Sequence, residues 1–301
     1  MEINGTEILD TFAEAFPVWI SRVIITAATR EWAYTTASIT TGFATSKIAC
    51  PCEAGIEREL PAGETPDGRP GISILICAEK KNMKANVSAR VSQCVLPAPT
   101  THAFDGLPDA ASRFAIRMHY FGDRYEERCM VGGRNCWKIP VMEGDYIGEE
   151  TFGTVKGIAG GNFLVMGKDQ PSALSASMAA AAAIRGMPGV ITSFAGGIVK
   201  SGSKVASKNY RFPMPASTNH MFCPTLKGKI TDSLVPDGVG SIYEIVMNGT
   251  DEPVIRHAMK TGILAAAKTG QASHIGASNF DGRLGQYKFP LHILFSVKTG
   301  R

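Results

Sequence analysis

The sequence contains no long hydrophobic run and no regular cysteine framework. No stretch approaches the ~18 consecutive apolar residues of a transmembrane helix, and the longest bland run, residues 172–184, is mostly alanine. The first residues, 1–4, show no basic segment followed by an apolar one, so we expect no secretory signal. The seven cysteines are scattered and form no C-x-x-C pair, which is typical of free thiols in a reducing compartment. We therefore expect a cytoplasmic protein that does not bind a membrane.

Signature motifs of several enzyme classes are also missing. The sequence has no G-x-G-x-x-G that opens a helix, no H-E-x-x-H and no G-x-S-x-G, which argues against a dinucleotide enzyme, a zinc protease and a serine hydrolase. Residues 197–204 resemble a P-loop, but the Lys and Ser stand in the wrong order. Cys50 and Cys52 lack a second pair at metal spacing, so no metal site is predicted. This shortage favours chemistry between two bound substrates, in which the protein supplies position and charge stabilisation.

The composition is that of a globular protein with about two domains. The chain has 301 residues, of which 44% are hydrophobic and 19% are charged, enough apolar material for a core. Residues 1–150 carry a net charge of −5, whereas residues 151–301 carry +9. The basic residues of the second half are mostly single rather than clustered with aromatics, so the charge favours an anionic ligand or partner over nucleic acid.

Strand-like and helix-like runs alternate along both halves, which predicts an α+β fold. Each half contains two strand–helix–strand crossovers, the content of a split β-α-β sandwich, and the repeated pattern predicts lobes of residues 1–147 and 148–301. The predicted strands are residues 18–27, 71–77, 114–120, 136–142, 161–167, 241–248, 273–279 and 285–294, with 114–120 and 136–142 paired around Gly132 and Gly133. The predicted helices are residues 29–40, closed by Gly42, 81–94, 171–186, begun by Pro171, and 251–268, capped by Asp251.

Glu244 is the most unusual ionisable residue of the sequence. The other six acids of the second half flank turns or loops, whereas Glu244 lies inside the apolar run S-I-Y-E-I-V-M-N. A buried carboxylate is costly unless it is paired or protonated, and desolvation raises its pKa. A neutral carboxylic acid can then donate a hydrogen bond near neutral pH. The alternatives are a solvated glutamate on an edge strand, or one that is paired with a nearby Lys or Arg.

Three Gly/Ser-rich loops are candidate ligand-binding segments. Their residues are 160–162, 196–204 and 216–219. Such loops expose backbone N–H groups and permit close approach of a ligand, and Lys204 and Lys208 could add positive charge for phosphate or carboxylate. Ordinary turns are an equally good interpretation of these loops.

Several motifs in a fixed order give the chain a resemblance to formylmethanofuran–tetrahydromethanopterin formyltransferases over nearly its full length. The matching segments are M-E-I-N-G-T-E-I-L-D-T-F-A-E-A-F at 1–16, T-G-F-A-T-S at 41–46, E-T-P-D-G-R-P-G at 64–71, G-G-N-F at 160–163, G-G-I-V-K-S-G-S-K at 196–204, A-S-T-N at 216–219, Y-E-I-V-M-N-G at 243–249 and L-G-Q-Y at 284–287.

The resemblance implies two ferredoxin-like lobes related by pseudo-duplication, no prosthetic group, and a homodimer or homotetramer. It implies reversible transfer of a formyl group between tetrahydromethanopterin and methanofuran, bound together in a ternary complex. The carboxylate of the Y-E-I-V motif corresponds to Glu244 and is expected to be protonated and to donate to the tetrahedral oxyanion. The expected substrate-binding residues are Gly160, Gly161, Asn162, Gly196, Gly197, Ser201, Ser203, Lys204, Ser217 and Asn219.

The sequence also departs from the family pattern as we expect it. The mildly basic charge favours the methylotrophic-bacterial branch, in which the chain would be the formyltransferase subunit of a formyltransferase/hydrolase complex and would act toward formate in formaldehyde oxidation. Residues 275–279 read I-G-A-S-N where I-S-A-G-N is expected, and residues 296–301 extend past the usual end. These departures leave an alternative open: a non-catalytic subunit that binds the pterin or docks a hydrolase.

Overall fold

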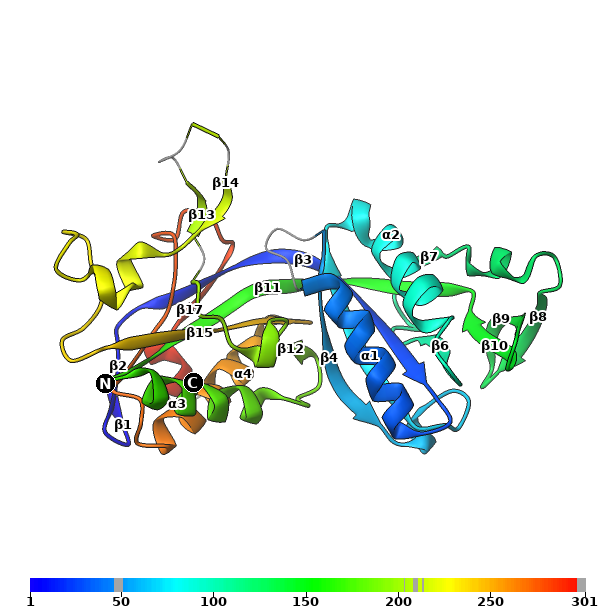
Figure 1. Cartoon of the computed structure of the whole chain (residues 1–301), viewed down its shortest axis with the longest axis horizontal. Helices are drawn as coiled ribbons and strands as arrows, with labels where there is room; N and C mark the ends of the chain where they lie inside the picture. The colour runs from blue at the N-terminus through cyan, green and yellow to red at the C-terminus, as the bar shows by residue number, and fades with distance from the viewer. Residues whose placement is uncertain (46–50, 203, 208–210, 213, 297–301) are drawn as a thin grey trace, which may run out of the picture. The chain divides into compact units, whose positions relative to one another are not determined.

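The structure is a computed structural model that describes residues 1–45, 51–202, 204–207, 211–212, 214–296. Cys50, Ser203, Lys208 and the residues after 296 lie outside this described part. Two compact units compose the chain (Figure 1). The first contains residues 1–17, 158–185 and 194–301, and the second contains residues 18–157 and 186–193. The sequence predicts two continuous lobes that meet at residue 147, whereas each compact unit combines separate segments of the chain. The two predicted lobes stay a prediction.

The described residues form four α-helices and a mostly antiparallel sheet, which confirms a mixed α and β fold. In the first unit, β15 (Ser241–Gly249) and β16 (His274–Gly276) both pair antiparallel with β11 (Thr151–Gly167). The order continues from β16 to the parallel β2 and its hairpin partner β1. The shorter strands of this unit are β1 (Glu2–Ile3), β2 (Thr6–Ile8), β13 (Lys204–Ser207), β14 (Met214–Ser217) and β17 (Tyr287–Pro290), the last paired with the start of β3 (Phe12–Thr26).

Two capped helices, α3 (Gln170–Ile184) and α4 (Glu252–Lys268), pack against each other and against β15 (Figure 1). Asp169 accepts a hydrogen bond from Ser172 N at 2.9 Å, and Asp251 accepts one from Val254 N at 2.9 Å. These caps satisfy backbone donors that a helix start leaves free. The predicted starts at Pro171 and Asp251 and the end at Lys268 are thus confirmed.

In the second unit the strand order is β4-β5-β3-β6-β10-β9-β8, antiparallel except for the parallel pair β6–β10. Helices α1 (Arg30–Thr45) and α2 (Lys80–Arg90) pack on β5, and α2 continues as the π-helix η2 (Val91–Val95). The core beneath them includes Ile72, Ile74, Ile76, Val87 and Val91. The strands are β4 (Glu53–Leu60), β5 (Gly71–Ala78), β6 (His102–Asp105), β7 (Ser112–Ala115), β8 (Glu127–Val131), β9 (Arg134–Val141), β10 (Gly144–Glu149) and β12 (Val190–Ile191).

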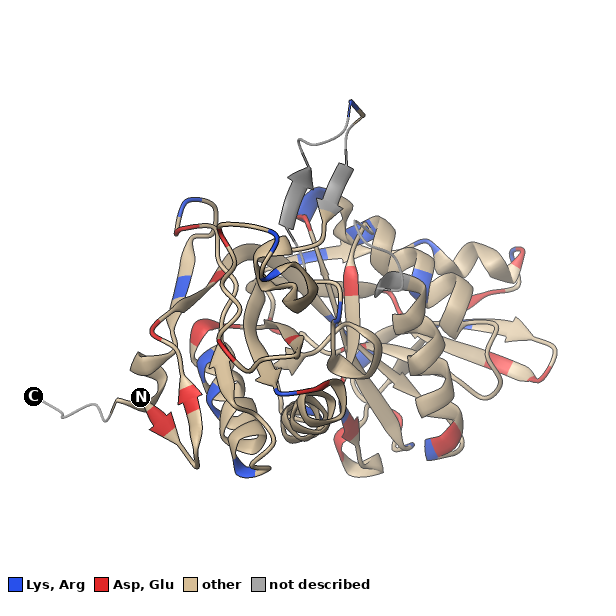
Figure 2. Cartoon of the chain, turned by 60° about the vertical axis from the view of Figure 1, so that its left-hand side comes forward, with Lys and Arg blue, Asp and Glu red and all other residues tan. Residues whose placement is uncertain are grey.

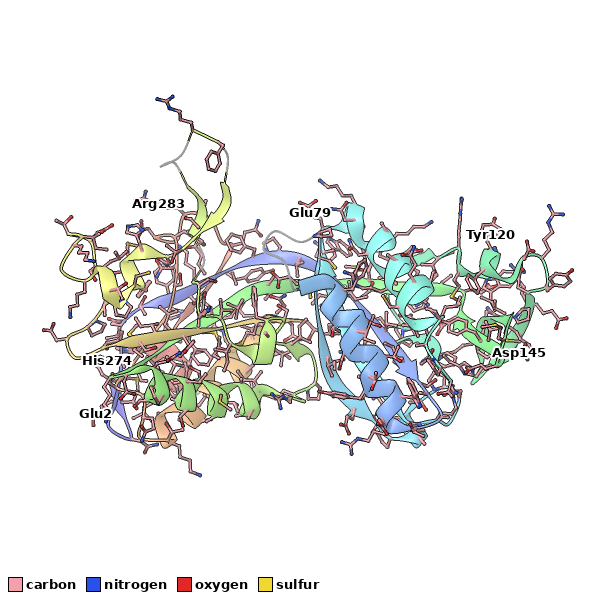
Figure 3. The ribbon with its side chains drawn as sticks, viewed as in Figure 1. Glu2, Glu79, Tyr120, Asp145, His274 and Arg283 are labelled. Atoms are coloured by element: carbon pink, nitrogen blue, oxygen red, sulfur yellow. The ribbon has the colours of Figure 1, made fainter. Side chains whose placement is uncertain are left out.

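Three local predictions were wrong. Helix α1 runs past Gly42 to Thr45, because a single glycine lowers helix stability without ending the helix. The partner of β9 across Gly132 and Gly133 is β8, not residues 114–120. Residues 112–115 instead pair with β11, and residues 118–122 form a 3₁₀ turn that exposes Tyr120 (Figure 3).

The last strands are shorter than predicted. Residues 273–279 contribute only the three residues of β16, and residues 285–294 contribute β17 followed by a 3₁₀ turn, His292–Phe295. The intervening loop is held by Glu14, whose carboxylate accepts backbone hydrogen bonds from Phe280 and Leu284 at 2.7 and 2.6 Å. A loop that satisfies its donors on a buried side chain has no need of a sheet partner.

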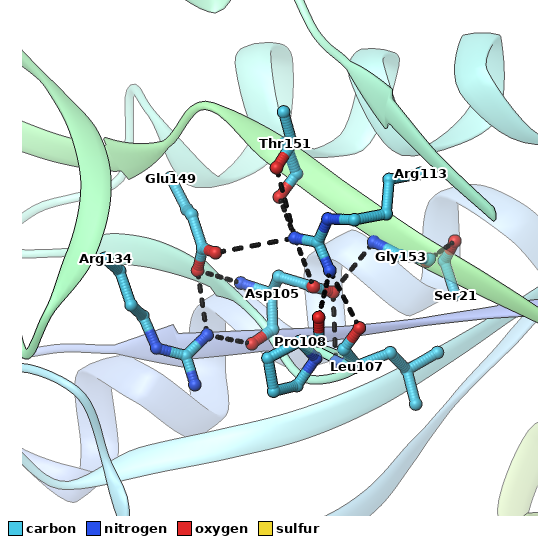
Figure 4. A network of polar contacts seen from close by, with 9 residues as sticks. All are labelled: Ser21, Asp105, Leu107, Pro108, Arg113, Arg134, Glu149, Thr151 and Gly153. Carbon is cyan, nitrogen blue, oxygen red and sulfur yellow. Dashed lines mark hydrogen bonds and ion pairs between the residues drawn. The ribbon is translucent and has the colours of Figure 1, made fainter. Parts of the chain in front are cut away.

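Two buried acids are neutralised in the second unit. Figure 4 shows Asp105 and Glu149 between the guanidinium groups of Arg113 and Arg134. The Arg113–Asp105 and Arg134–Glu149 ion pairs are each 2.9 Å long, and Asp105 N donates to Glu149 at 2.9 Å. Desolvation raises the pKa of Glu149 despite its ion pair with Arg134. The network joins β6 to β10 and is structural.

Charge of both signs is distributed along the ribbon. In Figure 2, Lys and Arg segments and Asp and Glu segments are scattered over the described part of the chain. The described helices include none that is long and apolar enough to cross a membrane.

Candidate functional site

Glu244 lies in the middle of β15, where its backbone is paired on both sides. It stands opposite Leu164 in the antiparallel register with β11. On the other side, its backbone N donates to Val199 O and its backbone O accepts from Val199 N, each at 2.8 Å. Its side chain is only 4% exposed. The predicted placement of this acid inside an apolar strand is confirmed.

The carboxyl group of Glu244 has no partner among the described residues. Its Oε2 atom is buried and makes no hydrogen bond there, and no described cation forms an ion pair with it. Desolvation raises the pKa of Glu244 to about 7, because burial penalises the charged form. A solvated edge-strand glutamate is therefore excluded, and within the described residues a Lys or Arg partner is too. The group is an acid that is substantially protonated near neutral pH.

This acid lies in the wall of a small, partly open pocket of about 40 Å³. Apolar residues line part of it, and small polar groups line the rest. The described lining residues are Leu164, Val199, Lys200, Ser201, Gly202, Asn219, Phe222, Cys223, Ile242, Glu244 and Ser278. Such a mixture of apolar wall and few polar groups is typical of small-molecule sites.

The loop 196–202 contributes one side of the pocket. Gly196 and Gly197 form a 3₁₀ turn before Val199 joins β15, and Ser201 then lines the pocket. Gly202 has φ +59°, and a Cβ there would lie 3.2 Å from Cβ of Asn219. The absence of a side chain at Gly202 thus allows the loop to approach Asn219 closely.

The remaining residues of this loop region lie in or before the β13–β14 hairpin. Lys204 and Ser217 are opposite each other in that hairpin. The described pocket lining does not include Ser217, Gly196 or Gly197, and the side chain of Lys204 is outside the described part of the structure. Ser203 falls outside the described residues.

The loop 160–162 supports the site rather than lining the pocket. Gly160 forms a β-bulge with φ +93°, and its N donates to Asn248 Oδ1 at 3.1 Å. A Cβ on Gly161 would lie 2.7 Å from Cγ2 of Ile255 in α4. Asn162 is 6% exposed and binds the backbone of Ser278 through both ends of its amide.

Asn219 and Ser278 meet at the pocket wall. Asn219 Nδ2 donates to Ser278 Oγ at 3.2 Å, while its buried Oδ1 has no hydrogen-bond partner among the described residues. Cys223 Sγ donates to Asn219 O at 3.5 Å. Ser278, Phe222 and Cys223 were not predicted as site residues. The only sequence signal for Ser278 was the unusual order of residues 275–279.

Among the described residues no group of three or more His, Cys, Asp or Glu side chains could hold a metal ion. The described residues give this pocket one buried acid, with amide, hydroxyl and thiol groups and the cationic side chain of Lys200 also in its lining.

The chain belongs to the formylmethanofuran-tetrahydromethanopterin formyltransferase family. Residues 1–141 match the model of that family, and residues 144–294 match the model of its proximal lobe. The resemblance predicted from the motifs is thus confirmed.

Among curated relatives, the formylmethanofuran–tetrahydromethanopterin formyltransferases of Methanosarcina acetivorans and Methanocaldococcus jannaschii are 51% and 50% identical to this chain. Each match covers 98% of this chain and all of the relative. The solved formyltransferase of Methanosarcina barkeri has a TM-score of 0.94 and is 49% identical, covering 98% of this chain and all of the other.

A second solved structure is a chain of the formyltransferase/hydrolase complex of Methylorubrum extorquens, determined with methylofuran. Its TM-score is 0.91 at 36% identity, with 98% of this chain and 99% of the other covered. The complex is therefore a structural neighbour. Identity to the archaeal relatives is higher, so the methylotrophic-bacterial branch stays a prediction.

Proposed function

We propose that this chain transfers a formyl group reversibly between tetrahydromethanopterin and methanofuran, and that Glu244 is the catalytic acid. Family membership supports the reaction. The single observation that supports the role of Glu244 is its buried, unpartnered carboxyl group at a partly open pocket. Both one-carbon carriers are substrates in this proposal, and no prosthetic group takes part.

In the proposed reaction, the pterin ring nitrogen attacks the formyl carbon of formylmethanofuran. A C–N bond forms and the carbonyl oxygen becomes an oxyanion, to which protonated Glu244 donates a hydrogen bond. The old C–N bond then breaks, and methanofuran leaves as an amine that takes up the proton lost by the pterin nitrogen. The reverse reaction uses the same groups, and the net direction toward formate stays a prediction.

The predicted substrate-binding residues divide into two groups under this proposal. Ser201 and Asn219 line the pocket and would contact substrate directly. Asn162 would act through Ser278, and Gly160 and Gly161 through close packing. Gly196, Gly197, Ser203, Lys204 and Ser217 stay proposed contacts for the more distant, anionic parts of the carriers.

We further propose ferredoxin-like lobes. The order β4-β5-β3-β6 with α1 after β3 and α2 after β5 supports this for the second unit. The run β11-α3-β15-α4-β16 supports it for the first. Hydrolase subunits are proposed as partners on the likeness to the bacterial complex, and a homodimer or homotetramer is proposed on family membership. The thiols of Cys94, Cys129 and Cys223 form no disulfide, as is usual in a reducing compartment, which supports a cytoplasmic location.

The test is exchange of labelled formyl between the two purified carriers. Wild type should exchange label, Glu244→Ala should slow exchange by about 10²–10³-fold, and Glu244→Gln should keep part of the rate because its amide still donates. The control is Glu2→Ala, which removes an exposed carboxylate on β1.

Two results would contradict the proposal. Wild-type rates in Glu244→Ala would remove the acid from the mechanism. A wild-type chain that binds both carriers but exchanges no label would be the non-catalytic docking subunit instead.

A further inference from the structure

Two buried oxygen atoms at this pocket lack hydrogen-bond partners among the described residues. One is Oε2 of Glu244 and the other is Oδ1 of Asn219, whose residue is 7% exposed. Buried polar atoms in native proteins are nearly always satisfied, and an unsatisfied one costs free energy. The proposed hydrogen bond to the oxyanion gives the carboxyl group of Glu244 a partner in the reaction. It gives none to Oδ1 of Asn219.

The side-chain amide of Asn219 is bonded to Ser278. Its Nδ2 donates to Ser278 Oγ at 3.2 Å. Ser278 is itself fixed by Asn162, which accepts from Ser278 N at 2.8 Å and donates to Ser278 O at 3.1 Å. One of the two N–H donors of the Asn219 amide is bonded to Ser278, and the atom of this amide that is buried without a partner is the carbonyl oxygen, which can only accept.

The surroundings of Asn219 strengthen such an acceptor. Gly202 approaches it closely, and the apolar side chains of Leu164, Ile242 and Phe222 line the same pocket. Hydrogen bonds are electrostatically stronger beside apolar groups, where the local dielectric constant is lower than in bulk water. The group that fits Asn219 is thus a hydrogen-bond donor of a ligand in the pocket that Glu244 also lines.

We propose that Asn219 Oδ1 accepts the N–H of the formamide group of formylmethanofuran, while the acid O–H of Glu244 contacts the carbonyl oxygen of the same group. This inference rests on the proposed function and deepens it. A secondary formamide carries both an N–H and a carbonyl oxygen. The formyl nitrogen of the pterin product is tertiary and carries no N–H, so Asn219 recognises the methanofuran side of the reaction. Ser278 is a positioning residue that acts through Asn219.

The test combines one change in the ligand with one change in the protein, as in a double-mutant cycle, and measures binding by isothermal titration calorimetry. The ligands are formylmethanofuran and the same compound methylated on the formamide nitrogen. The proteins are wild type and Asn219→Leu, which keeps the shape but removes the acceptor. Methylation should weaken binding to wild type by about tenfold or more, because it leaves Oδ1 unsatisfied, and should weaken binding to Asn219→Leu by less than about threefold.

Positioning by Ser278 has its own readout. Ser278→Ala should raise KM for formylmethanofuran about five- to tenfold with little change in kcat, and Ser278→Thr, which keeps the hydroxyl, should restore KM. The matched control is Asn135→Leu, the same chemical change at an exposed residue of β9 in the other compact unit. It should leave the methylation effect at its wild-type size.

The outcomes separate the two proposals. Equal methylation factors in wild type and Asn219→Leu, in an enzyme that still transfers formyl, would overturn the role of Asn219 alone. A cycle that shows the expected coupling in a protein that transfers no formyl would overturn the proposed function and leave the formamide site standing. No detectable binding of formylmethanofuran would overturn both.

Discussion

Val199 and Glu244 exchange two backbone hydrogen bonds of 2.8 Å, so the glycine-rich loop is joined directly to the strand that carries the acid. The bridge places Lys200, Ser201 and Gly202 at the pocket without any contact to the Glu244 carboxyl among the described residues. The acid therefore has fixed backbone geometry and an unsatisfied side chain, an arrangement that several measurements can test.

The stability of the protein should depend on the protonation of Glu244. Its pKa rises from the ordinary 4.5 to about 7 in the folded state, so protonation favours folding. This contribution is complete below pH 4.5 and is lost as pH rises through about 7. Relative to Glu244→Gln, wild type should lose on the order of 3 kcal/mol between pH 4.5 and pH 8. Denaturant unfolding at both pH values measures it, and a pH-independent difference would contradict the burial of a neutral acid.

The rate of formyl transfer should also fall as pH rises. The oxyanion donor is the protonated form of Glu244, which declines above about pH 7. Wild-type kcat should decrease above that value, whereas the lower kcat of Glu244→Gln should be flat, since an amide does not titrate there. Stopped-flow assays from pH 5.5 to pH 9 give the comparison. Parallel pH profiles in the two proteins would assign the titration to another group.

Alkylation of Cys223 should inhibit the enzyme. Its half-buried thiol lines the pocket, whereas burial raises the pKa of Cys94 and Cys129 and makes their thiolates scarcer. N-ethylmaleimide should inactivate wild type, formylmethanofuran should protect it, and Cys223→Ala should resist. Mass spectrometry identifies the modified thiol. Equal sensitivity of Cys223→Ala would place the sensitive thiol elsewhere.

Loss of Glu14 should destabilise the first unit. Burial disfavours its charge, but backbone N–H groups of Gly285, Phe280, Leu284 and Gly282 outweigh this and lower its pKa. Glu14→Ala should cost at least about 3 kcal/mol, because several buried donors lose their acceptor. The contribution of the carboxylate is present above its ordinary pKa and is lost as pH falls through the lowered value. Urea unfolding of Glu14→Ala and the exposed control Glu2→Ala at pH 7 and pH 3 tests both statements.

Removal of Arg113 should be costly for the second unit. The guanidinium forms an ion pair with buried Asp105 and donates to backbone oxygens of Leu107 and Pro108 (Figure 4). Arg113→Ala should destabilise the protein by about 3–5 kcal/mol, since it leaves a buried carboxylate without its partner. Arg283→Ala, on an exposed ion pair of 3.8 Å, should change stability by less than about 1 kcal/mol. Thermal unfolding of the two variants decides the point, and similar melting temperatures would contradict it.

Local chemistry in the sequence was sufficient for the helices and for the acid. Asp251 and Pro253 mark the start of α4, and Glu244 is conspicuous because its neighbours in β15 are apolar. The partner of β9 and the role of Ser278 were not predictable in this way. Ser278 contacts Asn219 and Asn162, which are 59 and 116 residues away, and such contacts depend on tertiary packing that leaves no periodic signal in the sequence.

The bulge at Gly160 gives β11 one residue more than its partner β15 between Ala159 and Gly161. Side chains alternate between the two faces of a strand, so an extra residue reverses the parity of everything that follows it. Asn162, which holds Ser278, and Leu164, which lines the pocket, both lie after the bulge. Deleting Gly160 would thus move each side chain of β11 after the bulge to the opposite face of the strand. The side chains that now face the pocket would then face away from it.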